Sequence, residues 1–283
     1  MNNRLVLILL LICTLTGYAQ KNNVEARYVD DFAANVFRLT EVMFHDVINP
    51  PAAARFYAYS MLAAEKIVAE NSSQRYALNT VIRDYPSVLQ PPNARVNVYF
   101  SAIYAMLETG KGIIPSGHSL QEKQDLLYRD FLKSGIKKQV LDSSVNYAKR
   151  VAQIFIKHSK SDGYLKLSTL KRYEPRATDS TWYPTPPEYM AAVEPNWSTV
   201  RSFFLDSCEQ FTPMPPVRFN SQKGSPFYLL MHEVYVTGKN LTAEQNLIAR
   251  YWDCNPFANF YAGHVSVAIK KISPGGHWMS ITV

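Results

Sequence analysis

The sequence predicts an all-α protein in which amphipathic helices form a bundle. Its apolar residues recur at three- and four-residue spacing, which is the period of a helix with one buried face, rather than alternating as in a strand. Asparagine, proline and glycine interrupt this pattern where helices are expected to begin and end. One long stretch, Asp162–Pro195, lacks the period and is rich in aromatic residues and prolines, which predicts an ordered loop.

Two helices are expected in the first part of the chain. The stretch Asp30–Ile48 places apolar residues on one face, namely Phe32, Val36, Leu39, Met43 and Val47. Asn49-Pro50-Pro51 interrupts it, because the residue before a proline avoids helical geometry. Ala52–Glu70 is rich in strong helix formers and predicts the second helix.

Three more helices are expected in the middle of the chain. Arg95–Glu108 has a helical apolar pattern, and the glycines in Thr109–Gly112 predict its end. Leu120–Lys133 and Lys137–His158 follow, separated by Ser134-Gly135. The sequence therefore predicts a set of helices joined by short turns before the long loop begins.

The region after the loop predicts three shorter helices. They are expected at Ser198–Cys208, Pro226–Thr237 and Thr242–Trp252. Thr242 and Gln245 fit a capping box, in which the side chain three residues along reaches back to the start of the helix.

The N-terminus has the features of a cleaved secretory signal, which we place at residues 1–19. A positively charged start precedes the apolar run Leu5–Leu15, which is too short to span a bilayer, and small residues lead to the cleavage site. We expect residues 20–283 to form an exported protein of the periplasm or the extracellular space. Later segments lack the apolar length of a membrane span, so no membrane association is expected after cleavage.

Charge and cysteine content restrict the function classes further. The formal net charge of +7 is spread along the chain without a basic run, which argues against nucleic-acid binding and supports only a mild attraction for anions. After signal removal Cys208 and Cys254 remain, and the sequence leaves open whether they pair or stay as free thiols. His232-Glu233 begins like a zinc-protease helix, but Val236 stands where the second histidine would be needed, so no metal site is expected.

The letters of Pro115-Ser116-Gly117-His118 match a signature with which certain phosphatases and vanadium haloperoxidases hold an oxyanion. Such a site also needs positive side chains, and the signature has an Arg-Pro pair upstream that this sequence lacks. Downstream, Arg150 and His158 are the nearest match. Eight helical residues would separate them by about 12 Å and turn them about 80° apart, so they would not converge on one small anion.

We therefore expect the stretch at Pro115 to be a turn that leads into the next helix. Ser119 and Glu122 have the spacing of a capping box, and His118 is expected on the surface. A small active enzyme built on Ser116 and His118 remains an alternative.

Three stretches in the C-terminal third carry a family resemblance. They are WYPTPPEYMAAVEPNW at Trp182–Trp197, FTPMPPVRF at Phe211–Phe219, and the run Tyr251–Ile281. They are similar to secreted vanadium-dependent haloperoxidase-like proteins related to type 2 phosphatidic acid phosphatases (PAP2), in the version common in Bacteroidetes. The resemblance extends from about Val24 to the last residue, and it implies a helical bundle with vanadate or phosphate bound at its heart.

The resemblance also implies that the oxyanion-binding residues come after a segment like Ser273–Ile281. We therefore expect residues 20–283 to be the N-terminal helical portion of a haloperoxidase-like domain, incomplete at the C-terminus and without catalytic residues. Vanadate, the cofactor of intact relatives, is not expected to bind stably here. The expected pocket-lining residues are His264, Lys271, His277 and Trp278.

Haloperoxidase and acid-phosphatase activities stay open as the function of an intact form. The first would use peroxide and halide, and the second a small anionic phosphoester. The alternative from another class is a non-enzymatic exported helical module that binds a partner through its aromatic and proline-rich loop.

Overall fold

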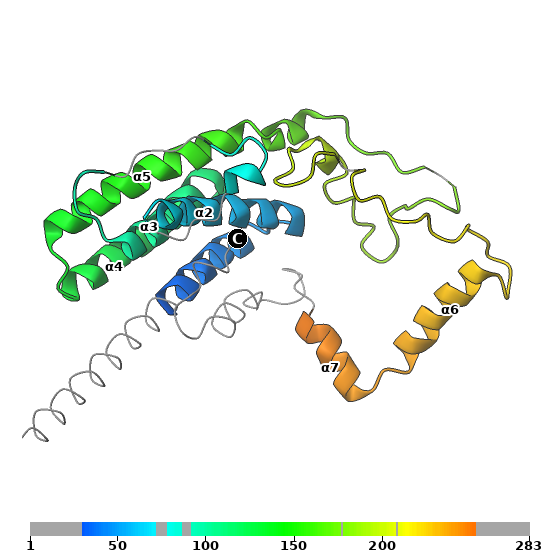
Figure 1. The fold of residues 1–283 in the computed structure, drawn as a ribbon. Coiled ribbons are helices and arrows are strands. Elements are labelled where there is room, and N and C mark those ends of the chain that lie inside the picture. The colour runs from blue at the N-terminus through cyan, green and yellow to red at the C-terminus, as the bar shows by residue number, and fades with distance from the viewer. Residues whose placement is uncertain (1–29, 72–77, 87–91, 177, 208, 253–283) are drawn as a thin grey trace, which may run out of the picture. The chain divides into compact units, whose positions relative to one another are not determined.

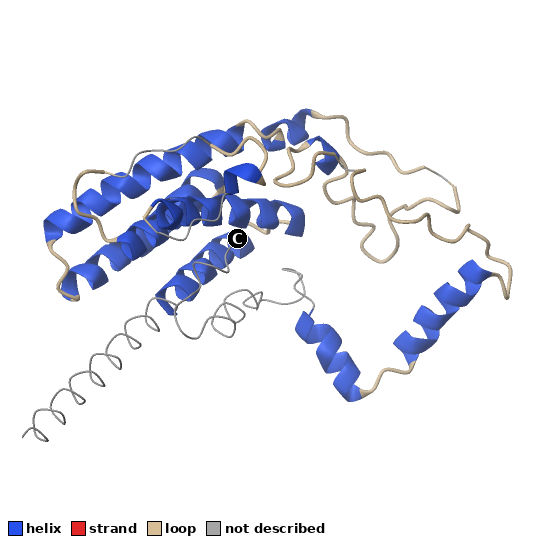
Figure 2. Ribbon diagram, in the orientation of Figure 1, coloured by secondary structure: helices blue, strands red, loops and turns tan. Residues whose placement is uncertain are grey.

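The computed structural model describes residues 30–71, 78–86, 92–176, 178–207 and 209–252. Every regular element in these ranges is a helix, as Figure 2 shows. The described residues form two compact units. Residues 30–71, 86 and 92–159 make up the first unit, and residues 78–85 and 160–252 the second. Among the helices searched, which are those of the described residues, none is long and apolar enough to cross a membrane.

The first helix of the first unit covers residues 30–45. Phe32, Val36, Leu39 and Met43 are buried on one face, as their spacing predicts. The helix ends earlier than expected because the backbone turns at Val47, which has a φ of 52°. Val47 is 51% exposed and therefore does not extend the buried stripe.

Helix α2 comprises Pro50–Glu70 and begins two residues before the predicted start. The side chain of Asn49 accepts a hydrogen bond of 3.0 Å from the backbone N–H of Ala52, which caps the first turn. Pro50 and Pro51 fit into this turn because their missing N–H groups would have no helical partner there. The prolines thus start the second helix, whereas the first helix has already ended at residue 45.

Helix α3 comprises Val98–Ile113 and lies against α2 and α4 (Figure 1). All residues from Phe100 to Gly110 are buried, so this helix forms the centre of the first unit. The predicted end near Glu108 is wrong, because α3 continues through both glycines. A Cβ at Gly110 would come within 2.5 Å of Leu39, and one at Gly112 within 2.4 Å of an Ile156 methyl group. These glycines permit close packing and do not end the helix.

Helices α4 and α5 complete the first unit and comprise Leu120–Lys133 and Lys138–Lys160. The turn between them is confirmed at Gly135, whose φ of 93° is a left-handed conformation that glycine adopts without strain. Helix α5 also contacts α2, where the Tyr147 hydroxyl donates a hydrogen bond of 2.8 Å to Glu70. Burial, followed by this hydrogen bond, raises the pKa of Tyr147, so the phenol remains a donor at neutral pH.

The second unit contains short 3₁₀ helices and two α-helices. They are η1 (Leu78–Thr80), η3 (Tyr164–Thr169), η4 (Trp197–Thr199), α6 (Pro226–Lys239) and α7 (Ala243–Trp252). The remainder of Asp162–Pro195 is irregular among the described residues, as predicted for the loop. Its aromatic residues are largely exposed, and Trp182 and Tyr183 keep 51% and 54% of their surface.

The predicted helix at Ser198–Cys208 is wrong, since only the short η4 overlaps its start. Backbone groups of this segment pair with distant residues instead of with one another. The N–H of Arg201 donates to the carbonyl of Asp162 at 2.8 Å, and the carbonyl of Phe203 accepts from Arg83 at 2.8 Å. These tertiary hydrogen bonds satisfy the backbone in a non-helical conformation.

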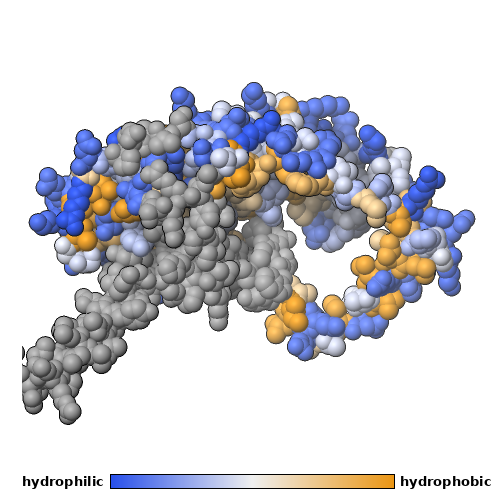
Figure 3. Space-filling model, viewed as in Figure 1, coloured by the Kyte–Doolittle hydropathy of each residue, from blue (hydrophilic) through white to orange (hydrophobic). Residues whose placement is uncertain are grey.

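The two later helices occur where the sequence predicts them, and the capping box is confirmed. Thr242 Oγ1 accepts from the N–H of Gln245 at 3.2 Å, and Gln245 Oε1 accepts from the N–H of Thr242 at 2.9 Å. Apolar surface is visible along α6 and at α7 in Figure 3. The exposed apolar residues of these helices include Leu229, Leu230, Met231, Val234, Leu247 and Ile248.

Candidate functional site

The stretch Pro115–His118, whose sequence matches the oxyanion-binding signature, lies between α3 and α4 in the first unit. Pro115 and Ser116 follow α3, and Gly117–Ser119 form the 3₁₀ helix η2. A Cβ at Gly117 would lie 2.5 Å from the carbonyl oxygen of Lys111, which is a backbone atom that cannot move aside independently. Glycine is therefore required here because the loop returns closely onto the end of α3.

A carboxylate of the same chain binds Ser116 of this loop. The backbone N–H of Ser116 donates to Asp46 Oδ2 at 2.8 Å, and the Asp46 side chain is only 7% exposed. Burial raises the pKa of Asp46, but hydrogen bonds from the hydroxyl and N–H of Ser116, together with His45, outweigh it and lower the pKa below 3.8. Asp46 is therefore an anion at neutral pH, and it is held by Ser116, the serine of the signature.

Vanadate does not fit this loop. A second anion at Ser116 would meet the charge of Asp46, and like charges at such short range disfavour binding. Arg150 and His158, the nearest matches to the other signature residues, do not supply the positive charge that would offset Asp46. Arg150 is exposed on α5, and the ring of His158 lies edge-on to Tyr59, with ring centroids 5.9 Å apart. The loop is thus a structural turn.

Two predictions about this loop have different outcomes. His118 is exposed, so its expected place on the surface is confirmed. The capping box of Ser119 and Glu122 is wrong, because Ser119 already has helical backbone angles and its side chain makes no capping hydrogen bond. Its hydroxyl donates instead to the carbonyl of Ser116 at 2.8 Å. Helix η2 leads directly into α4, which leaves Ser119 without the extended geometry of a cap.

The pocket-lining residues expected from the sequence lie outside the described residues. They are His264, Lys271, His277 and Trp278, and Cys208 and Cys254 also lie outside. Among the described residues, no group of three histidine, cysteine or acidic side chains is placed to hold a metal ion.

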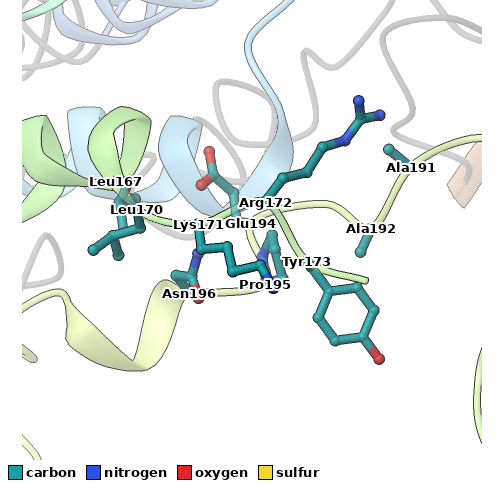
Figure 4. A pocket seen from close by; sticks show the side chains of 10 residues that line it. All are labelled: Leu167, Leu170, Lys171, Arg172, Tyr173, Ala191, Ala192, Glu194, Pro195 and Asn196. Carbon is teal, nitrogen blue, oxygen red and sulfur yellow. The ribbon is translucent and has the colours of Figure 1, made fainter. Parts of the chain in front are cut away.

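A hollow in the second unit brings basic side chains to a surface, and Figure 4 shows its lining. It has a volume of about 180 Å³ and lies between residues 167–173 and 191–196. Lys171 is paired with Glu174 at 3.3 Å, and both side chains are more than three-quarters exposed. The Arg172 guanidinium extends away from the Lys171 ammonium in Figure 4. These two cations therefore do not form a common anion-binding point.

A larger hollow of about 360 Å³ lies in the first unit between α3, α4 and α5. Its lining includes Tyr104, Asp125, Tyr128, Lys138 and Asp142. Sequence reasoning missed this group because the residues come from three helices. The available local signal was the four-residue spacing of Lys138 and Asp142, which pair at 2.7 Å on α5.

The helical fold of the described residues, and not the stretch at Pro115, indicates the class of the protein. Its fold is that of the all-α vanadium-dependent haloperoxidases, and the chain is related to these proteins.

The comparison that establishes this relation is with a crystal structure of a bacterial vanadium-dependent iodoperoxidase. The TM-score is 0.79, the sequence identity is 29%, and the match covers 90% of this chain. This chain covers 64% of the length of the iodoperoxidase chain. No protein-family model matches the sequence, and a search of curated proteins gives no match.

Proposed function

We propose that this chain is the helical scaffold portion of a haloperoxidase-like or acid-phosphatase-like protein, and that it does not hold a catalytic oxyanion by itself. The observation that carries this proposal is the hydrogen bond between Asp46 and Ser116. It indicates that the loop at Ser116 is a structural element and not an oxyanion site. The comparison is consistent with it, since this chain covers 64% of the iodoperoxidase chain.

In a complete protein of this class, bound vanadate would supply the activation of peroxide for halide oxidation. The described residues would contribute the packing that holds the helices of the bundle together. Gly110 and Gly112 let neighbouring side chains approach α3 closely, and the buried link from Tyr147 to Glu70 joins α5 to α2. We further propose that the protein is exported after removal of residues 1–19, on the basis of their sequence alone.

Activity assays with a matched variant test the first proposal. The purified chain is given orthovanadate, hydrogen peroxide and iodide, and separately p-nitrophenyl phosphate, alongside a His118→Ala variant. We expect rates equal to the protein-free blank for both proteins. Turnover by the wild-type chain would contradict the proposal, and its loss in His118→Ala would assign the activity to the loop at Ser116.

The N-terminus tests export independently. Expression in a Gram-negative bacterium followed by mass spectrometry of the periplasmic fraction is expected to give a chain that begins near residue 20. An uncleaved chain confined to the cytoplasm would contradict the export proposal.

A further inference from the structure

The hollow between α3, α4 and α5 has the size and lining of a site for a small polar molecule. Its volume of about 360 Å³ is at the lower end of the range of ligand pockets. Tyr104 comes from α3, Asp125 and Tyr128 from α4, and Lys138 and Asp142 from α5. Three helices of one unit therefore fix the relative positions of these side chains.

Tyr104 provides an unused hydrogen-bonding group in this hollow. The residue is only 5% exposed, and its hydroxyl forms no hydrogen bond with the part of the chain that the structure describes. Burial, followed by the charges of Glu108 and Asp125, raises the pKa of Tyr104 to about 12. The phenol therefore stays neutral in the physiological range. The ring of Tyr104 is thus held by the surrounding helices, while its hydroxyl is available to a ligand that enters the hollow.

The two carboxylates of the hollow differ in how many of their oxygens have a hydrogen-bond partner. Both oxygens of Asp142 are used, one by the Tyr128 hydroxyl at 2.7 Å and the other by the Lys138 ammonium at 2.7 Å. Asp125 Oδ1 accepts from Gln121 at 2.9 Å, whereas Oδ2 has no hydrogen-bond partner among the described residues. Asp125 is thus the carboxylate that has capacity for a further donor or cation.

The charge balance selects the sign of the ligand. Asp125 and Asp142 oppose the single cation Lys138 in the lining, which leaves one net negative charge. The nearby carboxylate of Glu108 is already paired with Lys111 at 2.7 Å. Two tyrosine rings also line the hollow, and aromatic faces attract organic cations. The one cation of the lining, Lys138, is already paired with Asp142 at 2.7 Å, so the lining offers an anion no free positive group.

We propose that this hollow binds a small organic ammonium ion, with the charge facing Asp125, the body against the rings of Tyr104 and Tyr128, and a hydroxyl group bonded to Tyr104. The site lies in the first unit and is independent of the loop at Ser116. It does not rest on the proposed haloperoxidase-like function, and it requires no vanadate.

Choline is a suitable probe because a neutral isostere, 3,3-dimethylbutan-1-ol, separates charge from shape. The full chain is titrated with each compound, and binding is followed by calorimetry and ligand-observed NMR. We expect saturable choline binding that is at least tenfold tighter than binding of the neutral alcohol. Equal affinity for the two compounds, or no saturable choline binding, would overturn the proposal.

Two substitutions locate the binding. Asp125→Asn is expected to weaken choline binding about tenfold, and Asp130→Asn, an exposed acidic position on the same helix outside the hollow lining, is the matched control with no expected change. Tyr104→Phe removes one hydroxyl and is expected to weaken choline about threefold to tenfold, as for one hydrogen bond. Tetramethylammonium lacks a hydroxyl and should bind this variant as it binds wild type.

The pattern across variants decides the outcome. Unchanged choline affinity in Asp125→Asn, or an equal loss in Asp130→Asn, would place binding elsewhere and contradict the proposal. An equal loss of both ammonium ions in Tyr104→Phe would contradict the assigned hydroxyl contact.

Discussion

Removal of the Asp46 carboxylate is expected to release the loop between α3 and α4. The carboxylate accepts the backbone N–H of Ser116 at 2.8 Å, and its side chain is 7% exposed. A hydrogen bond to a charged group contributes about 1.5–3 kcal/mol, and one between neutral groups about 0.5–1.5 kcal/mol. We therefore expect Asp46→Ala to reduce the free energy of unfolding of the first unit by about 2 kcal/mol and Asp46→Asn by about 1 kcal/mol.

The effect should depend on pH with a defined sign. The pKa of Asp46 is lowered from 3.8 by folding, so its stabilisation is fully present above the unfolded-state value and is lost as the pH falls through the lower folded-state value. The stability difference between wild type and Asp46→Asn should stay constant from about pH 5 to pH 7 and shrink below about pH 4.

Two measurements check this prediction. Urea unfolding followed by circular dichroism gives the stability difference, and hydrogen exchange with mass spectrometry gives the local opening of residues 114–120. Asp130→Ala, at an exposed position on α4, is the control and should change stability by less than about 0.5 kcal/mol. Equal effects of Asp46→Ala and Asp130→Ala, or unchanged exchange at Ser116, would refute the assigned role of Asp46.

Three further predictions concern packing and capping. Gly117→Ala should destabilise the first unit by about 1–3 kcal/mol, because its Cβ would lie 2.5 Å from the Lys111 carbonyl oxygen. The control is Gly238→Ala, which has open space around the added Cβ and should not destabilise the protein. Similar urea midpoints for the two variants would argue against the close approach at Gly117. Tyr147→Phe removes the 2.8 Å hydrogen bond to Glu70 and should lower the free energy of unfolding by about 1.5–3 kcal/mol in the same urea assay. An unchanged free energy of unfolding would show that this hydrogen bond contributes little. Thr242→Ala should cost about 1 kcal/mol of helix stability in α7, seen as faster exchange of the amide of Gln245, and unchanged exchange there would contradict the capping role.

Local signals were sufficient for several helices. Leu120–Lys133 has the predicted bounds, because serine and glycine follow it and its apolar spacing is regular. The cap at Thr242 was also predictable, since both of its hydrogen bonds lie within four residues. Where the neighbouring residues contain the physical cause, the sequence indicates the structure directly.

Other features depend on residues that are distant in sequence. Gly110 and Gly112 signal a helix end by local rules, but here they make room for Leu39 and Ile156 from other helices. The segment after η4 is not helical because its backbone pairs with Asp162 and Arg83.

The candidate sites show the same limit. Ser116 meets Asp46 across 70 positions of sequence, and the hollow at Tyr104 is lined by three separate helices. The sequence alone showed that the signature at Pro115 was incomplete, but it did not reveal which group takes the place of the oxyanion.

Vanadium-51 NMR of orthovanadate in the presence of the full chain tests most directly whether the loop at Ser116 is structural. We expect the resonance to keep the width and position of free vanadate, for wild type and for His118→Ala alike. A broadened or shifted resonance with wild-type protein that returns to the free signal in His118→Ala would contradict it.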